Sequence, residues 1–144
     1  MSVSYTVFLD VRRFPSARDL NAHARKRKLP IVIDESTELR SLAGHLPSTF
    51  AESSTSFEFL PQARHEMEFD DEILEDLAES IGTRDLAVSF VGRDKLSVSA
   101  ALVAACTLCD MADGVLFAEE SGSVFAADEV IELAEDETLE FVDG

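Results

Sequence analysis

One continuous apolar segment, residues 96–112, constrains the fold of this chain more than any other feature. It is rich in alanine and carries apolar side chains on every side of the helix that it predicts. Such a helix packs on more than one side, and its small side chains let neighbouring backbones approach closely. Its longest uncharged run, Leu96 to Cys109, has 14 residues, fewer than the roughly 18 to 20 that span a bilayer. We therefore expect a central core helix that Gly114 stops.

Short strands are expected on both sides of this helix in the sequence. Residues 34–56 are the least regular part, because Gly44, Pro47 and the Ser/Thr cluster at 53–56 indicate loops. A loop with a late glycine, Gly122, predicts a hairpin between the last two strands. The pattern predicts strands at residues 4–11, 31–33, 48–51, 57–60, 86–91, 115–117 and 123–125.

Capping signals locate a helix near each end of the chain. Ser16 is a natural N-cap with Asp19 three residues on, and this first helix runs into the basic residues 25–28. Asp128 caps a short last helix that we expect to continue through Ala134. Residues 135–144 then form an acidic C-terminal tail that we expect to be loosely ordered.

The order of these elements predicts the fold class. Helices interspersed with short strands indicate an α+β fold with a mainly antiparallel sheet, packed against the alanine-rich helix and an amphipathic acidic helix. A length of 144 residues is the usual size of one domain, and no linker divides the chain. We therefore expect a single domain over residues 1–144.

Charge is distributed very unevenly along the chain. Residues 1–65 carry 9 Lys and Arg against 7 Asp and Glu, whereas residues 66–144 carry 3 against 22, which together give the net charge of −17. A halophilic protein would be acidic throughout, and the first 65 residues are slightly basic. A field of this sign favours a cationic partner and repels nucleic acid and anionic lipid.

The acidic helix is the best candidate for a functional surface. Residues 66–79 hold 8 acids and no base, while Ile73, Leu74, Leu77, Ala78 and Ile81 recur at helical spacing. Asp70 is the expected N-cap, with Phe69 and Leu74 placed as a hydrophobic staple. An apolar stripe facing the core turns the acids outward, although net charge alone can also serve solubility. The expected partner-binding residues are Asp70, Asp71, Glu72, Glu75, Asp76 and Glu79.

No residue pattern predicts catalysis or a cofactor. Cys106 and Cys109 form a CxxC late in the apolar helix, where burial raises thiol pKa, so they are expected to pack as small hydrophobic residues. His65 lies beside carboxylates, but its spacing matches no metal motif. We therefore predict no catalytic residue, no metal and no cofactor, and hence no enzyme.

The stretch from Ala100 to Ala134 resembles a known class of proteins. The apolar helix leads into Asp113-Gly114-Val115-Leu116-Phe117, an acidic turn at 119–122, a second strand and a capped helix. This order, together with Gly44-His45-Leu46-Pro47 earlier in the chain, is similar to that of the small bacterial immunity proteins that accompany polymorphic toxins and secretion-system effectors. The resemblance implies a protein that binds and neutralises a cognate toxin and has no catalytic residues.

Three hypotheses follow for function. The first is a cytoplasmic, non-enzymatic immunity-type inhibitor that binds a cationic toxin or effector domain, since no signal peptide is visible in the first residues. Apolar anchors would come from within the acidic surface, and the candidates are Phe50, Phe57, Phe59 and Phe141. The second is a nucleic-acid mimic that occupies a DNA- or RNA-binding protein. The third is a small enzyme or metal protein that uses His65 or the CxxC.

Overall fold

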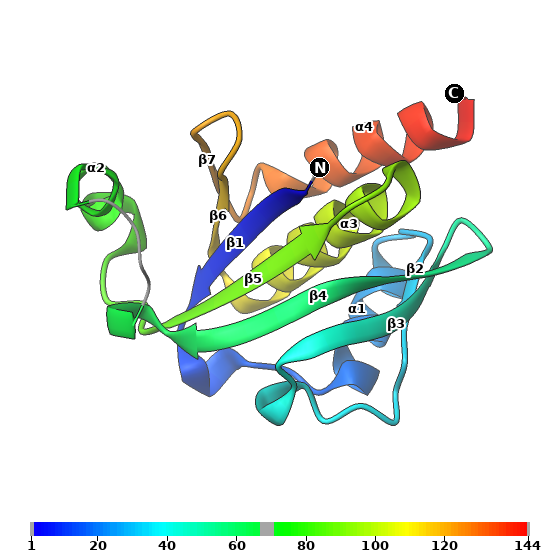
Figure 1. Cartoon of the computed structure of the whole chain (residues 1–144), viewed down its shortest axis with the longest axis horizontal. Coiled ribbons are helices and arrows are strands. Elements are labelled where there is room, and N and C mark those ends of the chain that lie inside the picture. The colour runs from blue at the N-terminus through cyan, green and yellow to red at the C-terminus, as the bar shows by residue number, and fades with distance from the viewer. Residues whose placement is uncertain (1, 67–70, 144) are drawn as a thin grey trace.

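The computed structural model, which describes residues 2–66 and 71–143, confirms a single α+β domain with one antiparallel sheet (Figure 1). Seven strands follow the order β2-β3-β4-β5-β1-β6-β7. The strands are β1 Val3–Leu9, β2 Ile31–Ile33, β3 Gly44–Phe50, β4 Ser53–Ala63, β5 Leu86–Gly92, β6 Val115–Ala118 and β7 Ser123–Ala126. The helices are α1 Ala17–Lys26, α2 Asp71–Ile81, α3 Lys95–Ala112 and α4 Val130–Asp143, with short 3₁₀ helices at Val11–Arg13, Leu39–Ser41 and Arg64–Glu66.

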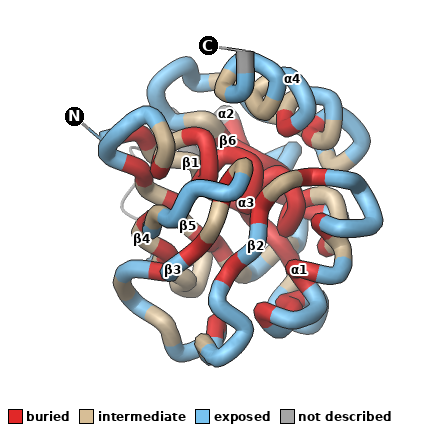
Figure 2. The backbone as a smooth tube through the Cα atoms, turned by 90° about the vertical axis from the view of Figure 1, so that its right-hand side faces the viewer, coloured by how far each residue is buried: buried red, intermediate tan, exposed pale blue. Residues whose placement is uncertain are grey.

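The helix α3 is the centre of the core, as its composition predicts. It packs against β1, β4 and β5 of the sheet and against α1 and α4 at its sides, and Figure 2 shows it as a buried segment inside the molecule. By length and composition α3 could also cross a membrane, but 72% of it is buried within the protein. It begins with a capping box in which Asp94 and Ser97 satisfy each other's backbone N–H groups.

Aromatic side chains fill the space between α3 and the sheet. Phe59 and Phe90, on the paired strands β4 and β5, meet edge to face with ring centroids 5.2 Å apart. Phe50, Phe57 and Phe59 are each no more than 1% exposed. These three were expected as candidate anchors for a partner, and the structure shows that they belong to the core.

A second, smaller core lies on the other side of the sheet. Successive residues of a strand point to opposite faces, so Val7 contributes to the α3 core while its neighbour Phe8 does not. Phe8 instead clusters with Leu77 and Ile81 of α2 and with Ala87 and Phe117 of the sheet. The helix α2 therefore covers one end of the sheet face opposite α3, and it stands apart from the other three helices in Figure 1.

The strands expected at 48–51 and 57–60 are longer than predicted, and together they form a hairpin that includes part of the segment expected to be irregular. Gly44 and Pro47 lie in β3, and the Ser/Thr cluster at 53–56 lies in β4, with Pro47 paired to Ser56. Leu46, Ser48 and Phe50 are buried in alternation, which holds β3 in register. The turn between the strands consists of Ala51 and Glu52, both with positive φ. This conformation normally selects Asn or Gly, so Ala51 and Glu52 carry no turn signal.

The end of α3 also differs in detail from the expectation. The residue in the left-handed conformation is Asp113, with φ of 52°, and not Gly114. Gly114 is required for a different reason, because a Cβ at this position would lie 2.8 Å from the carbonyl oxygen of Phe8. The glycine thus lets the chain pass close to β1 as it enters β6.

The last helix is longer than expected. It does not end at Ala134, because α4 continues to Asp143, and residues 135–143 are therefore helical turns and not a separate tail. Val130 and Ala134 are fully buried, and the ring of Phe141 packs edge to face on Phe50 with centroids 5.2 Å apart. These inward contacts at helical spacing fix the helix on the core, while the carboxylates of Glu132, Glu135, Asp136 and Glu140 are exposed.

Candidate functional site

The acidic surface of α2 presents carboxylates at successive turns of the helix. Glu72, Glu75 and Glu79 are exposed, and none forms an ion pair with another described residue. Leu77 and Ile81 on the opposite side are 3% and 2% exposed. The helix is therefore amphipathic as predicted, although Ala78, expected in the apolar stripe, is exposed.

Only part of the expected binding set lies among the described side chains. Asp70 and Phe69 lie outside the described residues, so the predicted N-cap and staple are untested. Asp71 and Asp76 belong to α2 by their backbone. The surface that the structure describes is thus that of Glu72, Glu75 and Glu79.

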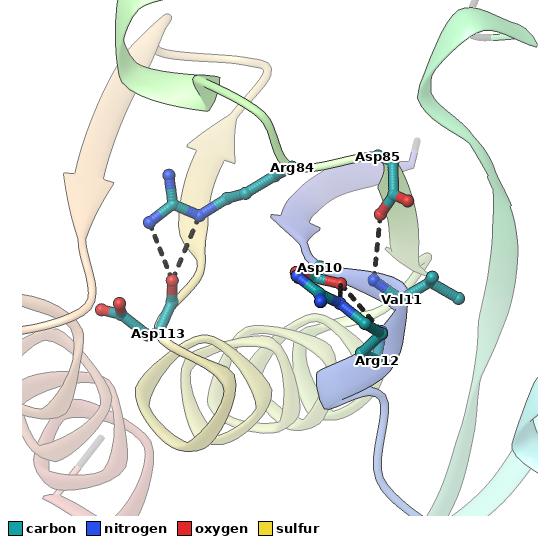
Figure 3. A network of polar contacts seen from close by, with 6 residues as sticks. All are labelled: Asp10, Val11, Arg12, Arg84, Asp85 and Asp113. Atoms are coloured by element: carbon teal, nitrogen blue, oxygen red, sulfur yellow. Dashed lines mark hydrogen bonds and ion pairs between the residues drawn. The ribbon is translucent and has the colours of Figure 1, made fainter.

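Arginine side chains fix the C-terminal end of α2 to the rest of the molecule. The guanidinium of Arg84 donates hydrogen bonds to the carbonyl oxygens of Ser80 and Ile81 and, from Nε and Nη2, to that of Asp113 (Figure 3). Arg64 donates to the carbonyl of Gly82 over 2.7 Å. Cations at the carbonyl end of a helix are favourable, so these contacts hold the acidic surface in one orientation.

A second polar cluster ties the same loop to the beginning of the chain. Asp85 accepts a hydrogen bond from the backbone N–H of Val11, and Asp10 binds Arg12 through both carboxylate oxygens (Figure 3). The side-chain and backbone hydrogen bonds from Arg12 lower the pKa of Asp10 to about 2. The cluster therefore fixes the connection between β1 and α1 against the start of β5.

A hollow of about 610 Å³ lies beside Arg84, lined by the end of α2, residues 113–115, β7 and the residues just before α4. Arg84 is the cation in its wall, but its N–H groups are directed at backbone carbonyls. The remaining charge on the wall comes from the carboxylates of Asp113, Asp128 and Glu129. The hollow is therefore part of the structural anchor and gives no reason to expect an anionic ligand.

The two acidic segments do not form one surface. The helix α2 packs on the sheet face that carries Phe8, whereas α4 packs on α3 at the opposite face. Glu132, Glu135, Asp136 and Glu140 of α4 are exposed and form no ion pair with another described residue. The negative charge that the sequence concentrates in one half of the chain is thus divided between two separate surfaces.

The cysteines are placed as predicted. Cys106 and Cys109 are free, buried and 0% exposed within α3. Burial is the main cause that raises the pKa of the Cys106 thiol well above its ordinary range, and it raises that of Cys109 to about 12. Protonated, inaccessible thiols are poor nucleophiles and poor metal ligands.

The histidines occupy three different settings. His65 is 83% exposed in its side chain and lies 4.0 Å from Glu66, and His45 is exposed on β3. His23 is instead packed between α1 and α3, with Nε2 2.6 Å from Oδ2 of Asp110, which also accepts from Arg27 Nε over 2.9 Å. Within the described part of the chain, no three His, Cys, Asp or Glu residues gather where they could hold a metal ion.

Sequence reasoning missed two features of the molecular surface. One is the His23–Asp110 contact, which joins residues 87 positions apart and has no local signal. The other is the exposure of Leu139 and Val142, which are 61% and 64% exposed among the acids of α4. Their spacing of three, out of phase with the inward-facing Ala134 and Phe141, is the signal that could have found them.

Comparison with known proteins adds no relative to these observations. Neither models of known protein families, nor curated protein sequences, nor solved structures give a match to this chain.

Proposed function

We propose that this protein is a non-enzymatic inhibitor of the immunity type, which binds a cationic toxin or effector domain through an acidic surface. The observation that carries the proposal is the row of exposed carboxylates of Glu72, Glu75 and Glu79 on α2, none of which forms an ion pair with another described residue. Like charges three and four residues apart repel one another, so this row is unfavourable in the isolated protein. A cationic partner would relieve that repulsion on binding.

Two further features support a role in binding. The α2 surface is held at its C-terminal end by Arg84 and Arg64, so little order has to be gained when a partner docks. The field of a protein with net charge −17 accelerates encounter with a cation, toward about 10⁸ M⁻¹s⁻¹ at low salt. The resemblance to immunity proteins is consistent with a fixed binding surface and with a strong negative charge.

The proposal is tested with a toxin-like protein encoded beside this one. Co-production of this chain should restore growth of cells that make the toxin, and the two proteins should co-purify. Reversing two charges, Glu75→Lys with Glu79→Lys, should slow association by about 10-fold or more and weaken protection. The matched control is Glu38→Lys with Glu52→Lys, which changes net charge equally at exposed sites away from α2.

The results separate the α2 surface from general electrostatics. An equal loss of affinity in both double variants would mean that only the net charge matters, and would remove α2 from the mechanism. If the wild-type chain neither binds nor protects against the adjacent gene product, the proposed function itself fails.

A further inference from the structure

The outer surface of α4 combines exposed apolar side chains with exposed carboxylates. Among the described residues, the large apolar side chains most exposed to solvent are Leu139 and Val142, both on α4. They lie one helical turn apart, and around them stand the exposed carboxylates of Glu132, Glu135, Asp136 and Glu140. Figure 2 shows this side of α4 at the margin of the molecule, facing solvent. Exposed apolar side chains flanked by charged ones are typical of a protein interface.

A hollow beside Leu139 gives this surface depth. It has a volume of about 350 Å³ and lies between the end of α1 and α4, where Leu29, Thr138 and Leu139 supply its apolar wall. Its other wall carries the cations Arg27, which is bonded to Asp110, and Lys28, together with the carboxylate of Glu135. Leu29 and Leu139 suit the hollow to an apolar side chain, and Arg27 and Lys28 disfavour a partner's cation inside it, so the partner's cations would lie along the exposed carboxylates of α4.

The helix that carries this surface is fixed on its inner side. Phe141 packs on Phe50 and lies under the ammonium group of Lys95, 5.9 Å from the ring centroid. Ser99 donates a hydrogen bond to Glu137 over 2.9 Å. Leu139 and Val142 are therefore not needed to hold α4, and their substitution should leave the fold intact.

We infer that the outer surface of α4, centred on Leu139 and Val142, is the docking site for a cationic, amphipathic segment of the protein partner. One apolar side chain of that segment enters the hollow between Leu29 and Leu139, and its basic residues pair with Glu135, Asp136 and Glu140. The inference rests on the proposed function for the sign of the partner's charge. It assigns the apolar part of the contact to α4 and not to α2.

The test uses a synthetic helical peptide in which leucine and lysine recur at amphipathic spacing, added to the isotope-labelled full chain. The amide signals of α4 and of residues near Leu29 should shift, and a peptide with glutamine in place of every leucine should bind at least about 10-fold more weakly. The double variant Leu139→Gln with Val142→Gln should lose about 10-fold in affinity with an unchanged circular dichroism spectrum. The Glu75→Lys, Glu79→Lys variant should bind the peptide no worse than the Glu38→Lys, Glu52→Lys control.

Other outcomes overturn the inference. Shifts confined to α2, or equal binding of both peptides, would show that α4 supplies no apolar contact. A concentration-dependent dimer of the free chain that Leu139→Gln abolishes would make the occupant a second copy. If the Leu139, Val142 variant protects against the toxin as well as the wild type does, the inference fails while the proposed function stands. If the wild-type chain itself does not protect against the toxin, the proposed function fails.

Discussion

The Nε2 atom of His23 lies 2.6 Å from Oδ2 of Asp110, so that a side chain of α1 is joined directly to one of α3. Asp110 is only 9% exposed in its side chain and also receives Arg27 Nε over 2.9 Å. Both contacts of Asp110 join α3 to α1 or to the residue that caps the C-terminal end of α1. This contact therefore fixes where the basic helix lies against the core.

The first prediction concerns this carboxylate. Asp110→Asn should lower the free energy of unfolding by about 2 kcal/mol, because the amide nitrogen cannot accept the hydrogen bonds of His23 and Arg27. Asp136→Asn on α4 is the control, since Asp136 is exposed and has no described partner, and it should change stability by less than about 0.5 kcal/mol. Urea unfolding of both variants checks the difference. Equal stability would mean that the His23–Asp110 contact contributes nothing net.

A second prediction concerns the thiols. In the folded protein Cys106 and Cys109 should react with a thiol reagent on the order of 100-fold more slowly than in denaturant, because reaction requires opening of the core. Their pKa values are raised on folding, so the unfolded chain loses thiol protons first as pH increases. Stability should therefore fall as pH rises above the ordinary thiol pKa of 9.0.

The control for this pH dependence is the double variant Cys106→Ala, Cys109→Ala. In this variant the stability should fall less as pH rises, because the thiols no longer contribute to the loss. Thermal unfolding across the same pH range measures the difference. Rapid labelling of the native protein would contradict the buried positions of both residues.

A third prediction concerns the approach of β5 to α3. A Cβ at Gly92 would lie 2.5 Å from both the Cα and the N of Val98, so Gly92→Ala should destabilise the protein by about 3 kcal/mol through displacement of the helix. Gly122→Ala is the control, since a Cβ there meets nothing within 4 Å and only the φ of +72° is unfavourable. It should cost about 1 kcal/mol. Similar losses in chemical denaturation would show that the close approach at Gly92 relaxes easily.

The fourth prediction concerns the last turns of α4. Phe141→Ala should lower the free energy of unfolding by about 2 kcal/mol, because the ring packs on Phe50 at the edge of the core. Leu139→Ala, two residues away on the exposed side, should lower it by less than about 0.5 kcal/mol. Comparable stability of the two variants would mean that residues 135–143 are not docked in solution.

The sequence predicted those parts of the fold that depend on local patterns. The apolar helix at 96–112, the cap at Ser16 and the hairpin around residues 118–122 are all present, because each rests on periodicity or turn chemistry within a few residues. The strands expected at 48–51 and 57–60 are parts of β3 and β4, but the turn that joins them has no sequence signal, because Ala51 and Glu52 adopt a left-handed conformation without glycine or asparagine. The predicted last helix ends too early, at Ala134. The acids of residues 135–143 make the helical spacing of the inward-facing residues Val130, Ala134 and Phe141 difficult to recognise.

The candidate surfaces were predictable only in part. The outward orientation of Glu72, Glu75 and Glu79 follows from the apolar spacing of α2, and the structure agrees. The separation of α2 from α4 could not be inferred, because it depends on which face of the sheet each helix covers. An amphipathic helix has the same local sequence whichever face of the sheet it covers. Only the pairing of distant strands determines which face that is.

The sheet order also determines when the molecule can fold. The first strand of the chain, β1, lies between β5 and β6 and pairs with residues 86–92 and 115–118. During synthesis β1 therefore has neither neighbour until most of the chain has been made, and its buried Val7 and Phe8 have no core to enter. Such long-range pairing slows folding and leaves an unpaired strand open to association with other chains. A nascent chain of this protein would thus benefit from a holding chaperone until β5 emerges.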